Sequence, residues 1–137
     1  MIDTRELRDV ITTRIHNSGF IPTDCFAWSN IIFNPTGKGL WISEAYLPAT
    51  GGYHNSVKND YEQGIFQFTI YIDINNPKGE IVVNDIANSI ANLFTTPETI
   101  TTENTKTSIV LNKSFQGKID DKWYASIIDI NYKCYNK

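Results

Sequence analysis

The sequence predicts an α+β fold: a mixed, mostly antiparallel sheet of about five strands, with two helices packed on one face of the sheet. Two stretches place apolar residues at three- and four-residue spacing, which is typical of amphipathic helices. Other stretches alternate apolar and polar residues, as strands buried on one side do. The segment order of helix, three strands, helix and two strands lacks the alternation of a doubly wound parallel sheet.

The first helix is expected over residues 3–17, where polar and charged residues separate an apolar stripe. That stripe consists of Leu7, Val10, Ile11 and Ile15. Asp3 or Thr4 can cap the start of the helix, and Gly19 suits the left-handed position after its last turn.

Short extended segments follow the first helix. Residues 25–33 and 40–48 are rich in β-branched and aromatic residues, and each is expected to form a strand. The segment 34–39 between them has the Asn-Pro and glycine composition of a turn. Residues 49–60 form a polar loop that is long for a connection between strands.

Residues 62–74 give the clearest strand in the sequence, because the alternation persists too long for a helix. One face carries Phe66, Phe68, Ile70, Ile72 and Ile74, and the other carries Gln67, Thr69, Tyr71 and Asp73. The first face is expected to enter the core and the second to remain partly exposed.

A second helix is expected over residues 80–94, followed by a polar connector at 95–105. The helix stripe consists of Val82, Val83, Ile86, Ala87, Ile90, Ala91, Leu93 and Phe94. Residues 107–115 and 122–135 read as the last two strands, and the glycine-containing segment 116–121 reads as the hairpin turn between them.

Composition favours one globular domain covering residues 1–137, because 41% hydrophobic residues are enough to bury a core. The net charge of −3 and the lack of a lysine or arginine block argue against a nucleic-acid-binding surface. Cys25 and Cys134 stand far apart without metal-ligand spacing, so reduced thiols are expected. The N-terminus does not resemble a signal peptide, and no apolar run is long enough for a membrane span, so assembly in the cytoplasm is expected.

The sequence contains no motif that predicts catalysis. His54 could act as a general base, but no nucleophile motif accompanies it. The pair Asp120 and Asp121 is typical of a turn, and the TGKG segment at 36–39 precedes a strand instead of the helix that a phosphate loop requires. We therefore predict no catalytic residue, no cofactor and no metal site, and a protein that is not an enzyme.

The loop 49–60 and the polar face of the strand 62–74 are the candidate contact surfaces. A long loop with glycines is suited to docking or to subunit contacts, although a tolerated surface loop would have the same composition. The candidate interface residues are Tyr53, His54, Lys58 and Asp60 in the loop, and Gln67, Thr69, Tyr71 and Asp73 in the strand.

The ordered set of segments resembles the tail-terminator, or tail-completion, proteins of long-tailed bacteriophages. The resemblance is carried by DTRELRDVITTRI, AWSNIIFNP, LWISEAYLPA, YEQGIFQFTIYID, NDIANSIANLF and WYASIIDINYKC, which together cover nearly the whole chain. The polar connector 95–105 and the Asn- and Ile-rich composition depart from the family pattern, so no catalytic residue is carried over.

The resemblance implies a structural virion protein that forms a ring, typically a hexamer, at the head-proximal end of the tail tube. Such a ring stops tube polymerisation and joins the tail to head-completion proteins. The implied partners are further copies of the chain, the tail-tube protein and a head-tail connector, with genomic DNA only as passing cargo and no membrane. The implied location is the tail or neck of the virion. The alternatives are a small intracellular binding or adaptor module and a small hydrolase or nuclease.

Overall fold

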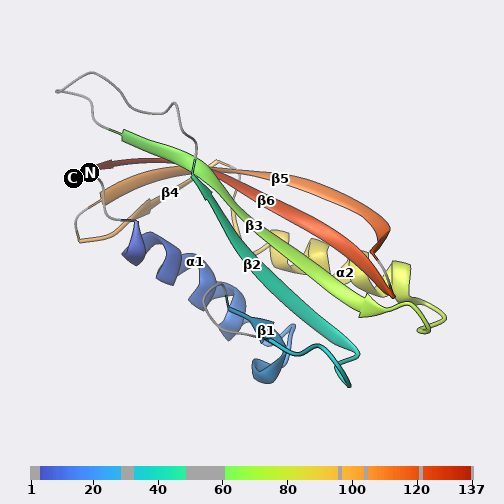
Figure 1. Cartoon of the computed structure of the whole chain (residues 1–137). Coiled ribbons are helices and arrows are strands. Elements are labelled where there is room, and N and C mark those ends of the chain that lie inside the picture. The colour runs from blue at the N-terminus through green and yellow to red at the C-terminus, as the bar shows by residue number, and fades with distance from the viewer. Residues whose placement is uncertain are drawn as a thin grey trace.

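The computed structural model describes residues 4–28, 33–48, 61–95, 97–103, 105–120 and 122–136. These residues form two helices and one six-stranded sheet with the strand order β1-β2-β3-β6-β5-β4 (Figure 1). The helices are α1 (Arg5–Asn17) and α2 (Gly79–Ala91), and a 3-10 turn, η1 (Thr23–Cys25), follows α1. The strands are β1 (Phe26–Ala27), β2 (Leu40–Pro48), β3 (Tyr61–Asp73), β4 (Glu98–Thr101), β5 (Thr105–Asp120) and β6 (Trp123–Asn136).

All neighbouring strands are antiparallel except β1 and β2, which are parallel. The predicted α+β fold with a mixed, mostly antiparallel sheet is therefore confirmed, with one strand more than expected. Long, twisted β3, β6 and β5 run together through the middle of the molecule (Figure 1).

Both helices cover the same face of the sheet, as predicted. From α1, the Thr12 hydroxyl donates to Glu44 of β2 at 2.6 Å. From α2, Asn84 accepts a hydrogen bond from Ser126 of β6 at 3.2 Å. The sheet register places Glu44 and Ser126 on the same face, the one that also carries the buried residues of β3.

The core lies between this face and the helices. Every second residue of β3 from Gly64 to Ile72 is buried, which confirms the alternation in the sequence. The helices contribute Leu7, Ile11, Ile15, Val83, Ala87, Ile90 and Ala91. Neither helix in the described part of the chain is long and apolar enough to cross a membrane.

The start of the chain differs from the prediction in two details. Thr4 occupies the position before α1, but its side chain does not cap the helix; its hydroxyl lies 3.3 Å from the Tyr46 hydroxyl instead. Of the described residues in the strand predicted over 25–33, Phe26 and Ala27 form β1, whereas Cys25 belongs to η1, where its N–H donates to the Pro22 carbonyl. Residues 29–32 lie outside the described residues. Gly19 has a φ of 78°, as predicted.

The C-terminal half contains a strand that the sequence analysis missed. Part of the predicted connector 95–105 forms β4, which pairs with β5 and is held to α1 by an ion pair between Arg14 and Glu98 at 2.9 Å. Helix α2 ends at Ala91, three residues earlier than predicted, although Phe94 is still buried.

The predicted turn at 116–121 was wrong, because β5 continues as a strand to Asp120. Residues of β6 as far as Trp123 pair with β5. The register of this pairing shifts between Ser114 and Lys118, where the glycine-containing segment lies. The hairpin therefore closes after Asp120, and β5 becomes the longest strand of the sheet, at 16 residues.

Candidate assembly interface

The sheet face opposite the helices is left uncovered by the described helices. We call it the open face: it carries the odd-numbered residues of β2, β3 and β6, and Lys106, Ser108 and Val110 of β5. Most of its residues in β3 are partly exposed, while their even-numbered neighbours are buried. An antiparallel sheet covered on one side only has this pattern.

The predicted strand residues Gln67, Thr69, Tyr71 and Asp73 all lie on the open face. The Gln67 side chain donates to Asp129 of β6 at 3.0 Å, so it is tied to its own sheet. Asp73 accepts a hydrogen bond from the N–H of Asn75 at 2.9 Å, which stabilises the turn after β3. The predicted loop residues Tyr53, His54, Lys58 and Asp60 lie outside the described residues.

One row across the open face is mainly apolar. Leu47, Ile65, Asn131 and Val110 are successive partners in the register of β2, β3, β6 and β5. Leu47 and Val110 lie at the two ends of this row and are 46% and 43% exposed. Leu47 and Val110 are thus apolar side chains that are exposed to solvent at opposite ends of the row.

Aromatic rings cluster at the other end of the open face. Trp41 stacks on Tyr71 with ring centroids 4.0 Å apart, and it meets Trp123 edge-on at 5.8 Å. Phe33 also stacks on Trp41, with ring centroids 5.1 Å apart. The buried Nε1 of Trp41 has no hydrogen-bond partner among the described residues. We call these four residues the aromatic corner.

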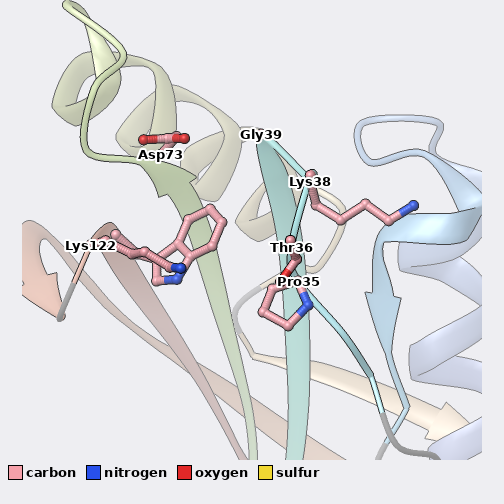
Figure 2. Close-up of a pocket in the computed structure, with 8 residues that line it drawn as sticks. Pro35, Thr36, Lys38, Gly39, Asp73 and Lys122 are labelled. Carbon is pink, nitrogen blue, oxygen red and sulfur yellow. The ribbon is translucent and has the colours of Figure 1, made fainter.

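A hollow of about 260 Å³ lies beside the aromatic corner, between the turn 35–39 and the start of β6 (Figure 2). Asp73, Lys122 and Trp123 line its far side. Lys38 points away from Asp73 and Lys122 (Figure 2) and pairs with Asp24 at 2.8 Å, a hydrogen bond that lowers the pKa of Asp24. The charged residues among those that line the hollow are therefore two lysines, Lys38 and Lys122, and one carboxylate, Asp73.

The helix-covered face holds a hydrogen-bonded chain of polar groups. The Tyr132 hydroxyl donates to the Tyr46 hydroxyl at 2.6 Å, and Tyr46 donates to Glu62. Burial is the largest cause that raises the pKa of both tyrosines above the ordinary value; the hydrogen bond to Glu62 adds to it for Tyr46, and the hydrogen bond to Tyr46 adds to it for Tyr132. No group of three or more potential metal ligands occurs within the described part of the chain.

The sequence profile of the phage tail terminator protein family matches residues 6–132. The chain belongs to this family. Tail terminators are structural phage proteins, so membership argues for a non-enzymatic role in the virion tail. A comparison with curated proteins finds no match to this tail terminator.

A solved structure, identified only by a sequence code, supports the fold of this tail terminator. It is 15% identical in sequence and superposes with a TM-score of 0.69, covering 100% of this chain and 97% of its own. At this identity the likeness concerns the fold alone.

Sequence reasoning missed two features of this tail terminator's open face. Trp41 and Trp123 were not among the candidate interface residues, although each is adjacent in register to a strand residue that was. The apolar row was missed as well, because Leu47 and Val110 are far apart in sequence and only the sheet register aligns them. The apolar residues at odd-numbered positions of β2 were the sequence feature that could have indicated these two features.

Proposed function

We propose that this tail terminator forms a ring, most simply a hexamer, at the head-proximal end of the phage tail tube. There it stops tube polymerisation and presents a surface to a head-tail connector protein. In this proposal residues 1–137 act as one domain, and the partners are copies of the chain, the tail-tube protein and the connector. Membership of the family over residues 6–132 is the observation that carries the proposal.

The open face supports an assembly role. It combines apolar, polar and aromatic side chains, as subunit contacts do, including Tyr71 and the partly exposed Leu47. We include Gln67, Thr69, Tyr71 and Asp73 among the interface residues. Tyr53, His54, Lys58 and Asp60 are included on the sequence argument alone.

The charge of the chain supports DNA as passing cargo. Phosphate binding is driven by clusters of lysine and arginine, and this chain carries a net charge of −3. A ring of such subunits would release DNA instead of retaining it, as a conduit between head and tail requires.

A tube-polymerisation assay tests the proposal. Purified tail-tube protein is allowed to polymerise with and without this chain, and tubes are measured by electron microscopy. We expect a ring at one end of each tube and shorter tubes as more of the chain is added. Tubes of unchanged length without an end ring would contradict the proposal.

Two matched lysine variants sharpen this assay. Thr69→Lys adds a charge to the open face, and Asn88→Lys adds the same charge to an exposed position of α2. We expect Thr69→Lys to weaken capping and Asn88→Lys to leave it unchanged. The opposite order would remove the open face from the proposed interface.

A further inference from the structure

Over most of its length, the outer edge of β5 has no pairing strand among the described residues. β4 pairs with β5 only from Lys106 to Ile109, and no described strand lies against the edge from Val110 to Asp120. Every second N–H and C=O along such a stretch points away from the sheet. An exposed edge of this length can form backbone hydrogen bonds with a strand of another chain.

The opposite side of the sheet has a related feature. β1 pairs with β2 only at Ile42 and Ser43. Among the described residues, none pairs with the outer edge of β2 from Glu44 to Pro48. In the part of the chain that the structure describes, one copy therefore carries two strand edges without a partner, and the two edges differ from each other.

The directions of these two strands suit each other. β2 and β3, β3 and β6, and β6 and β5 are three successive antiparallel pairs, so β2 and β5 run in opposite directions. If the sheet of one copy continued into the next, β5 would meet β2 in an antiparallel pair. Antiparallel pairing is the slightly more stable arrangement for each residue.

The apolar row selects one register for this pairing. Leu47 and Val110 lie at opposite ends of the same row and on the same face. Continuing the row from one copy to the next places Val110 directly opposite Leu47, where each removes the other from water. Their exposed fractions, 46% and 43%, leave that area available in the single subunit.

We infer that β5 of one copy pairs with β2 of the next, with Val110 opposite Leu47, and that this contact joins the subunits of the ring. The inference rests on the proposed function for the existence of a ring. The contact is head-to-tail, because it uses two different edges, and repeating it generates rings when the rotation closes. The partner is a second copy of this chain.

A disulfide between copies tests the contact. In the variant carrying Leu47→Cys and Val110→Cys, paired residues of neighbouring copies would have Cα atoms about 5 Å apart, within disulfide range. Within one chain the two positions are separated by three strand spacings, about 14 Å, so an internal bridge is excluded. We expect oxidation of rings assembled on tail tubes to give a ladder of covalent multimers under denaturing conditions.

Controls separate this ladder from random collisions. Each single cysteine variant should give no ladder, and Ile81→Cys combined with Val110→Cys should give none either, because Ile81 is exposed on α2. Wild-type protein sets the background, since Cys25 and Cys134 are free and buried. Val110→Lys, at an exposed position, should preserve the fold and weaken ring assembly about tenfold.

The outcomes distinguish the inference from the proposed function. Rings that form on tubes without cross-linking between positions 47 and 110 would overturn the strand pairing and leave the terminator function standing. Covalent dimers from Val110→Cys alone would overturn it in favour of a two-fold contact between β5 strands. Absence of any ring on tubes, with the wild-type chain, would overturn both.

Discussion

The rings of Trp41 and Tyr71 stack within one subunit, with centroids 4.0 Å apart and planes inclined by 12°. This contact joins neighbouring positions of β2 and β3 on the open face. Tyr71 therefore has a structural role in the isolated chain besides any role in assembly.

Replacing Tyr71 by Ala removes this stack. We expect the free energy of unfolding to fall by about 2 kcal/mol, because an aromatic pair adds to the apolar area that the ring buries. Urea unfolding of the isolated protein measures the change. Thr69→Ala, next on the same face, is the control and should alter stability by less than about 0.5 kcal/mol. Equal effects of the two variants would contradict a special role for the stack.

Gly79 begins α2 where β3 and β6 approach it. A Cβ at this position would lie 2.7 Å from Cδ2 of Tyr124 and 3.2 Å from Cγ2 of Ile72. We expect Gly79→Ala to destabilise the protein by about 1–2 kcal/mol, because overpacking outweighs the helix preference of alanine. Gly39→Ala is the matched control, since a Cβ there meets nothing within 4 Å. A stabilising effect of Gly79→Ala would show that the helix moves freely away from the sheet.

Arg14 links α1 to the β4 region. Its guanidinium contacts Glu98 at 2.9 Å, the Leu93 carbonyl at 3.2 Å and the ring of Phe94 at 4.8 Å. Both charged side chains are partly exposed, so we expect a coupling energy between Arg14 and Glu98 of about 0.5–1 kcal/mol. A double-mutant cycle with alanine at each position measures it. The coupling should shrink in about 1 M salt, where screening is strong; a coupling unaffected by salt would contradict an ionic contact.

The Tyr132–Tyr46 pair predicts instability in alkali. Both tyrosines have raised pKa values in the folded protein, so their protonated forms favour folding. This contribution is complete below the unfolded pKa of about 10 and is lost as the pH rises above it. Thermal unfolding measured between neutral pH and pH of about 11 should show a falling midpoint.

Tyr132→Phe tests the origin of that loss. The variant should cost about 1–2 kcal/mol at neutral pH, because it removes the hydrogen bond to Tyr46. The midpoint of its thermal unfolding should then fall less steeply above pH of about 10, since one titrating group is gone. An unchanged alkaline slope would place the pH dependence elsewhere in the protein.

Much of the fold could be predicted because its pattern is local. Two patterns each indicate which face is buried in the core: the alternation from Phe66 to Ile72, and the stripe of Leu7, Ile11 and Ile15. The predicted positions of Gln67 and Thr69 on the uncovered face follow from the same alternation.

The features that were missed depend on contacts between distant residues. β4 is short and polar. It forms a strand because it pairs with β5 and because Glu98 forms an ion pair with Arg14, and no local sequence pattern indicates either contact. The extension of β5 beyond residue 115 depends on the partners that β6 supplies. The alignment of Leu47 with Val110 requires the register of four strands.

The length of tails in particles that lack this protein tests the central claim most directly. The gene is deleted in the encoding phage, and tails are measured by electron microscopy with and without the chain supplied in trans. A ring that stops tube growth predicts over-long, variable tails without it and a single restored length with it. Tails of normal, uniform length in its absence would contradict the claim.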